Sequence, residues 1–136
     1  MKIIVTGGSG FVGNHTIQAL KEKGYEVFNY DISEGFDLLN KKQLKTIIKK
    51  GDKVLHEAAI ARFSDADTNP LLAYEVNVLG TKNIVEVCNA NKAERLVYAS
   101  TGSVYMPIKT LPITVALSSG FNSDGASGAG IYNQYI

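Results

Sequence analysis

A glycine-rich turn near the N-terminus constrains the fold of this chain more than any other feature of its sequence. The β-branched run at residues 3–5 predicts a short buried strand, and residues 6–13, with the sequence TGGSGFVG, follow it directly. From Phe11 onward, apolar residues continue at helical spacing to Lys23-Gly24, where basic residues and a glycine indicate a helix end. The pattern therefore predicts a strand, a tight turn and a helix in direct succession.

Three glycines of this turn, Gly7, Gly10 and Gly13, have the G-x-x-G-x-x-G spacing. Glycines permit a tight turn, and they let the backbone approach a diphosphate because no Cβ stands in the way. The free N–H groups and positive dipole end of the following helix would hold that diphosphate without a cationic side chain. The alternative is a glycine-rich turn that binds nothing. The predicted cofactor contacts in the turn are Gly7, Gly10, Phe11, Val12 and Gly13.

Strand and helix patterns alternate along the chain after this turn. We predict strands at residues 25–30, 53–56 and 95–99, and helices at 41–50 and 71–91. Such alternation indicates right-handed βαβ units. The predicted fold class is therefore α/β, a Rossmann-like doubly wound parallel sheet with helices on both faces.

Asp31 lies at the end of the second predicted strand, 18 residues after Gly13. A carboxylate at this place accepts hydrogen bonds from the adenosine ribose hydroxyls and repels a 2′-phosphate, so the sequence predicts NAD rather than NADP. Ile32 follows it and is included among the predicted cofactor contacts. The alternative is that Asp31 starts a turn, where aspartate is common.

The charge balance and the cysteine count exclude several classes of partner. Lys and Arg total 14 against 13 for Asp and Glu, so no broad positive field would hold nucleic acid or an anionic membrane. No stretch approaches the roughly 20 apolar residues of a membrane span. A single cysteine, Cys88, fits a reducing compartment. We expect a cytoplasmic protein that binds neither nucleic acid nor membrane.

Four further segments carry a family resemblance: FDLL at 36–39, HEAA at 56–59, NVLGTKN at 77–83 and VYASTGSVY at 97–105. With the glycine turn, they resemble the extended short-chain dehydrogenase/reductases, in particular the nucleotide-sugar epimerases and dehydratases. The resemblance covers residues 2 to about 114. It implies an NAD-dependent enzyme that acts on a nucleotide sugar by transient hydride transfer.

The resemblance also implies individual cofactor contacts. Asp37 and Leu38 would contact the adenine, Ala58 and Ala59 would line the dinucleotide, and Asn77 would lie under the nicotinamide half. Ordinary close packing of strand against helix is the alternative for the two alanines. For Asn77 the alternative is a buried polar group that caps a loop. No Cys, His or acidic cluster surrounds His56, so we expect a structural role for it and no metal site.

The catalytic residues match the family only in part. Thr101 occupies the family's catalytic Ser/Thr position, but the Tyr-x-x-x-Lys pair expected about 25 to 35 residues later is not found. Asp124 and Gly128 stand at the aligned positions, and no lysine follows Lys109. Without a positioned acid/base, which typically contributes about two to four orders of magnitude of rate, we expect the chain as written to be inactive.

The composition changes in the last part of the chain. We predict an NAD-binding domain at residues 1–114 and a Ser/Gly/Ala-rich tail without periodicity at 115–136. Three hypotheses stay open: an incompletely represented epimerase or dehydratase, a non-catalytic dinucleotide-binding module, and a reductase of a 4-keto-deoxysugar nucleotide. An uncovered edge at the strand ending near Ala99 would favour self-association.

Overall fold

The computed structural model describes residues 1–100 of the chain. They form a four-stranded, all-parallel sheet with the strand order β2-β1-β3-β4. The order reverses at β1, because the chain first moves outward to β2 and then returns across β1 to β3. The strands are β1 (Ile3–Thr6), β2 (Val27–Tyr30), β3 (Lys53–His56) and β4 (Arg95–Tyr98).

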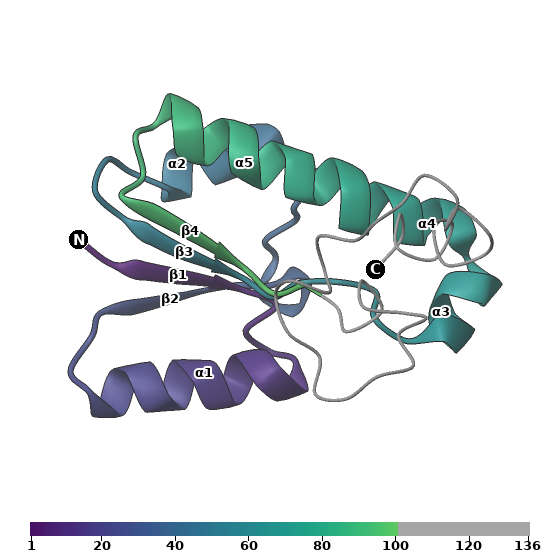
Figure 1. The fold of residues 1–136 in the computed structure, drawn as a ribbon, viewed down its shortest axis with the longest axis horizontal. Coiled ribbons are helices and arrows are strands. Elements are labelled where there is room, and N and C mark those ends of the chain that lie inside the picture. Colours follow the sequence, from purple (N-terminus) through teal and green to yellow (C-terminus); the bar gives the residue numbers. More distant parts are fainter. Residues whose placement is uncertain (101–136) are drawn as a thin grey trace, which may run out of the picture.

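Helices cover both faces of this sheet (Figure 1). Helix α1 (Phe11–Glu22) lies on one face, and α2 (Lys41–Ile47) and α5 (Thr81–Ala90) lie on the other. The predicted doubly wound α/β fold is confirmed.

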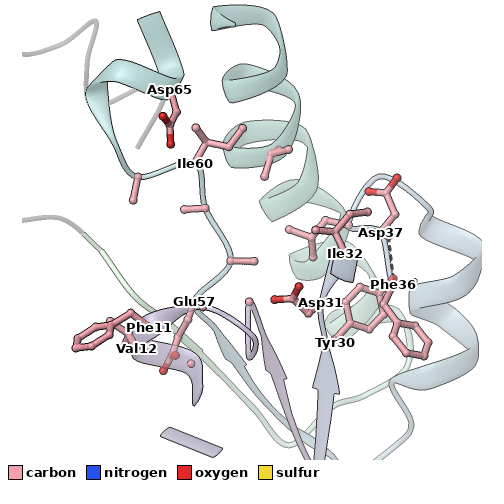
Figure 2. A pocket seen from close by; sticks show the side chains of 18 of the residues that line it. Phe11, Val12, Tyr30, Asp31, Ile32, Phe36, Asp37, Glu57, Ile60 and Asp65 are labelled. Atoms are coloured by element: carbon pink, nitrogen blue, oxygen red, sulfur yellow. Dashed lines mark hydrogen bonds between the residues drawn. The ribbon is translucent and has the colours of Figure 1, made fainter. Parts of the chain in front are cut away.

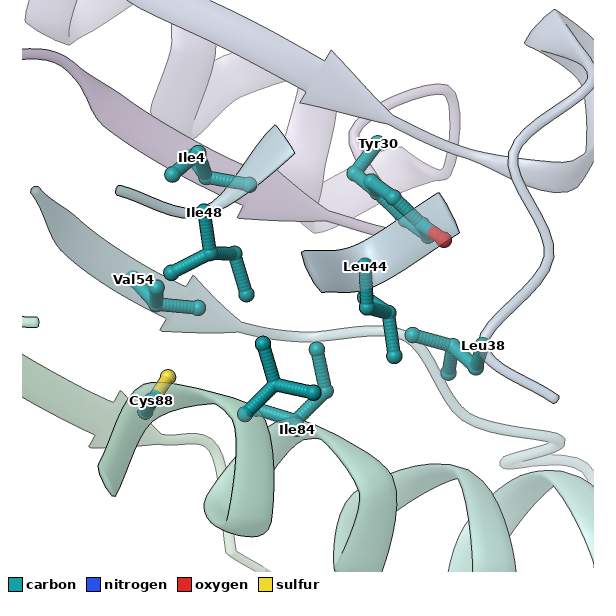
Figure 3. Packing of buried hydrophobic residues seen from close by; sticks show 9 residues of the cluster. Ile4, Tyr30, Leu38, Leu44, Ile48, Val54, Ile84 and Cys88 are labelled. Carbon is teal, nitrogen blue, oxygen red and sulfur yellow. The ribbon is translucent and has the colours of Figure 1, made fainter. Parts of the chain in front are cut away.

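The alternation of side chains along β1 divides the core between these two faces. Ile4 packs with residues of α2 and α5, including Leu44 and Ile84 (Figure 3), whereas Ile3 and Val5 pack against α1. Successive strand residues point to opposite faces of a sheet, and parallel strands are buried on both. This explains why β1 is a continuous apolar run with no polar face.

Two of the predicted elements are longer than the observed ones by two or more residues. The second strand begins at Val27 rather than at residue 25, because the Tyr25 N–H donates to the Leu20 carbonyl (3.1 Å) and so completes the end of α1. Helix α2 ends at Ile47 rather than at residue 50. The Asp52 carboxylate accepts the Lys49 N–H at 2.9 Å, which closes a turn in place of the last helical residues.

The long helix predicted at residues 71–91 consists of three consecutive segments. Helix α4 (Pro70–Tyr74) begins after Asn69, whose side chain accepts the Leu72 N–H at 3.1 Å. A π-helical segment, η2 (Glu75–Gly80), then leads into α5. Helix α3 (Phe63–Thr68) and a short 3₁₀ turn, η1 (Ile32–Glu34), were not predicted. Their few residues are too short for a hydrophobic period to show.

Candidate functional site

A cleft of about 780 Å³ lies beside the carboxyl ends of β1, β2 and β3, where the strand order reverses (Figure 2). In open α/β sheets this place holds ligands. Eleven of the twelve predicted cofactor contacts line the cleft, and Asn77 does not. These eleven are Gly7, Gly10, Phe11, Val12, Gly13, Asp31, Ile32, Asp37, Leu38, Ala58 and Ala59.

The glycine turn packs so closely that side chains are excluded from it. Gly7 has a φ of +72°, and a Cβ there would lie 2.7 Å from the Ala58 Cα. A Cβ on Gly13 would lie 2.2 Å from the Gly7 carbonyl oxygen. Both contacts are to backbone, which cannot move aside as a flexible side chain would. The turn therefore presents bare backbone to the cleft, as a phosphate-binding turn requires.

The N-terminus of α1 opens into the same part of the cleft. Its N-cap is Gly10, which provides no side-chain cap, and the first turn of the helix contains no acidic residue. The first N–H groups of a helix have no partner within it and carry the positive end of its dipole. The residues present therefore fit a bound diphosphate without help from a cation.

Asp31 stands beside this turn and is tied to it. One carboxylate oxygen, Oδ2, accepts the Ser9 N–H at 3.1 Å, and Oδ1 accepts the N–H and hydroxyl of Ser33 at 2.9 and 2.8 Å. Burial by itself would raise the pKa of Asp31, but these hydrogen bonds outweigh it and lower the pKa. The carboxylate thus starts a turn and also faces the cleft as an anion. Figure 2 shows it across the cleft from Phe11 and Val12.

The backbone at the end of β3 is fixed by a buried pair of side chains, Thr6 and His56. The Thr6 hydroxyl oxygen accepts the N–H groups of Glu57 and Ala58, each at 3.2 Å. Its own hydrogen is then free to be donated to Nδ1 of His56, 2.7 Å away. This leaves the proton on Nε2, which lies 2.8 Å from the hydroxyl of Thr81. His56 therefore has the structural role that we expected.

Burial lowers the pKa of His56 to about 4, because the side chain is shielded from water. At neutral pH the imidazole is therefore uncharged. If Nδ1 were protonated, its N–H would point at the Thr6 hydroxyl oxygen, which already accepts two backbone N–H groups. The hydrogen bond between Thr6 and His56 would then be lost. The neutral imidazole of His56 thus helps, through the Thr6 hydroxyl, to hold the backbone of Ala58 at the cleft.

Asn77 is buried and is not among the residues that line the cleft. Its Oδ1 accepts the Ile60 N–H at 2.8 Å, and its Nδ2 donates to the Ile60 carbonyl at 3.0 Å. Both polar groups of the amide are thus used to hold the segment after β3. This arrangement is the alternative that we gave for Asn77, a buried polar group that supports a loop.

Several cleft residues were not singled out from the sequence. Glu57 accepts a hydrogen bond from Thr16 (3.0 Å) through Oε1, while its Oε2 is buried with no partner among the described residues. Of the lining residues that the structure describes, Arg62 is the one Lys or Arg, and four others carry carboxylates. The segment from Ile60 to Arg62 directly follows β3, and its position after a strand end is the signal that could have indicated it.

Other predicted features cannot be placed. Thr101, Asp124, Gly128 and the tail at 115–136 lie outside the described residues. Within residues 1–100, no group of three or more His, Cys, Asp or Glu side chains is arranged to hold a metal ion. No helix in this part of the chain is long and apolar enough to cross a membrane.

Comparisons with known proteins agree on one family. Residues 3–121 match the NAD dependent epimerase/dehydratase family. The chain is 36% identical over 113 residues to the decarboxylating sterol-4-alpha-carboxylate 3-dehydrogenase of Mus musculus, covering 76% of this chain and 30% of that protein. It is 29% identical over 136 residues to the UDP-glucose 4-epimerase of Dictyostelium discoideum, covering 83% and 40%.

A solved structure shares the fold. The UDP-glucose 4-epimerase of Thermus thermophilus, in complex with NAD, matches with a TM-score of 0.73 and 31% identity. The match covers 84% of this chain and 42% of that one. The chain thus spans less than half the length of each of these three proteins.

Proposed function

Because the chain belongs to the NAD dependent epimerase/dehydratase family, we propose that its cleft is the NAD site of an enzyme acting on a nucleotide sugar. The observation that carries the proposal is the glycine turn, which meets the backbone of Ala58 with no room for a Cβ beside an open helix N-terminus. NAD is the cofactor of the family, so the predicted cofactor is confirmed at that level.

We assign the parts of NAD to parts of the cleft. The diphosphate would lie on residues 7–13, and the adenosine ribose would lie against Asp31. Asp37 and Leu38 would face the adenine, and Ala58 would lie along the dinucleotide. NAD supplies an acceptor for a hydride from the substrate, which is the chemistry implied by the family. The residues described here bind and orient it.

The nucleotide sugar is the finer part of the proposal. It is supported by the similarity to two UDP-glucose 4-epimerases, one in sequence and one in structure. The similarity to a sterol-carboxylate dehydrogenase supports hydride transfer but a different substrate. A non-catalytic module and a 4-keto-deoxysugar reductase remain the alternatives. Self-association and a cytoplasmic location stay predictions.

Calorimetric titration of NAD and NADP tests the cofactor site. The wild type should prefer NAD, because the Asp31 carboxylate repels a 2′-phosphate. In Asp31→Asn the charge is removed while an acceptor oxygen remains, so the preference for NAD should fall by about tenfold, equivalent to about 1.4 kcal/mol.

Asp65→Asn is the matched control, because it removes a carboxylate from the same cleft lining at a distance from the glycine turn. Its preference for NAD should stay as in the wild type. Equal binding of NAD and NADP by the wild type would contradict the role of Asp31. No binding of either dinucleotide would contradict the site itself.

A further inference from the structure

The loop of residues 36–39 lines one side of the cleft, and its polar groups suit adenine. Asp37 contributes a carboxylate acceptor to the lining, and the N–H of the neighbouring lining residue Leu38 would be the donor beside it. Adenine offers the matching pattern, an amino donor at C6 beside the acceptor N1. A 6-oxopurine such as hypoxanthine offers the opposite pattern.

Three consecutive peptide groups of this loop are each held by a side chain from a different element. The Asp37 N–H donates to Oε1 of Gln43 in α2 at 3.0 Å, and the Asp37 carbonyl accepts the Tyr30 hydroxyl of β2 at 2.8 Å. Burial, with the Asp37 charge nearby, raises the pKa of Tyr30, so its hydroxyl remains a donor. The Leu38 carbonyl accepts Nδ2 of Asn83 in α5 at 3.0 Å.

A single peptide group connects the Asn83 side chain to the Asp37 carboxylate. The peptide group that joins Leu38 to Leu39 accepts from Asn83 at its carbonyl, and its N–H donates to Oδ1 of Asp37 at 2.8 Å. Because a peptide group is planar and stiff, fixing its carbonyl also fixes the direction of its N–H. Asn83 does not itself line the cleft.

A close contact in the same helical region supports this arrangement. A Cβ on Gly80, the last residue of η2, would lie 3.0 Å from the Leu38 Cβ. Gly80 therefore lets the helix approach closely enough for the Asn83 amide to reach the loop. A π-helical turn at this point fits the frequent occurrence of such turns at functional sites.

We propose that Asn83 is a positioning residue for the purine end of the cofactor site. By holding the peptide group after Leu38, it aims the Asp37 carboxylate so that the loop accepts a 6-aminopurine and rejects a 6-oxopurine. This inference rests on the proposed NAD site.

The test compares NAD with nicotinamide hypoxanthine dinucleotide by calorimetric titration of the 136-residue chain. The wild type should bind NAD more tightly. In Asn83→Asp, which keeps the size of the side chain but loses the N–H donor, the affinity ratio should fall by about tenfold. A merely structural loss would weaken both ligands equally and leave the ratio unchanged.

Asn91→Asp is the matched control. Asn91, the residue that follows α5, donates Nδ2 to the carbonyls of Lys45 and Ile48 at 3.1 and 2.7 Å, and it does not line the cleft. It should lower the melting temperature but keep the affinity ratio. If Asn83→Asp does not fold, as judged by circular dichroism, Asn83→Ala carries the same expectation without an added charge.

The outcomes separate the two proposals. If the wild type discriminates between the two dinucleotides and the Asn83 variants do so equally well, the role of Asn83 is overturned and the NAD site stands. If the wild type binds NAD and nicotinamide hypoxanthine dinucleotide equally tightly, the preference of the Asp37 loop for a 6-aminopurine is overturned, and the role of Asn83 with it. Failure of the wild type to bind NAD would overturn the proposed function and this inference with it.

Discussion

His56 should make the stability of this chain strongly dependent on pH in the weakly acidic range. Its pKa is about 4 in the folded chain, compared with 6.5 for an ordinary histidine. Since each pKa unit is equivalent to about 1.4 kcal/mol, proton binding at this side chain removes about 3 kcal/mol of stability by the time the pH has fallen to about 4. The unfolded chain binds the proton first, so stability falls as the pH falls from 6.5 to about 4.

Urea denaturation followed by circular dichroism gives the measurement. Between about pH 7.5 and about pH 5, His56 should account for a loss of about 2 kcal/mol in the free energy of unfolding. His56→Gln cannot bind a proton, so it should be less stable than the wild type at about pH 7.5 but should lose less stability on acidification.

His15→Gln is the matched control, since His15 is the other histidine and is exposed on α1. The free energy of unfolding of this variant should fall by the same amount as that of the wild type between these two pH values. The reasoning would be refuted if His56→Gln and the wild type lost equal stability between these two pH values.

Two substitutions and a labelling experiment test the packing of the glycine turn and of the core. Gly7→Ala should cost about 1–3 kcal/mol of stability and abolish NAD binding, because the new Cβ would overlap the Ala58 backbone. Gly24→Ala, at a φ of +80° in open space, should cost about 1 kcal/mol and leave NAD binding intact. Burial raises the pKa of Cys88 from 9.0 to about 11, so a thiol reagent should label it about 100-fold more slowly in the folded chain than in urea. Equal rates would show that Cys88 is accessible.

The parts of the site that follow from local sequence were predictable. The spacing of Gly7, Gly10 and Gly13 required a turn with bare backbone, and the structure shows backbone contacts that leave no room for a Cβ at Gly7 or Gly13. Asp31 was predictable for the same reason, because its place at the end of β2 follows from the strand pattern alone.

The supporting contacts from the α4–η2–α5 region could not be predicted in the same way. Asn77 and Asn83 lie in what the sequence presented as a single amphipathic helix, and their partners, Ile60 and Leu38, are 17 and 45 residues away. Helical periodicity indicates which face is apolar but not where a π turn changes the direction of that face. The sequence therefore raised a supporting role for Asn77 only as an alternative, and the partners of both asparagines are known only from the tertiary contacts.

The charges of the cleft give a physical reason why one part of it would bind a diphosphate and the adjoining part would reject a 2′-phosphate. Among residues 1–100, four carboxylates and one guanidinium line it, so two phosphate charges of a dinucleotide would be repelled from most of this part of its surface. The open N-terminus of α1 is the part that offers bare N–H groups and a positive dipole end, with no acidic residue in its first turn. The anionic Asp31 at the edge of this turn then leaves no favourable place for a third phosphate. In the proposed NAD site, adjoining groups would therefore bind the diphosphate and reject a 2′-phosphate, because the Ser9 N–H donates to Asp31 and joins the two.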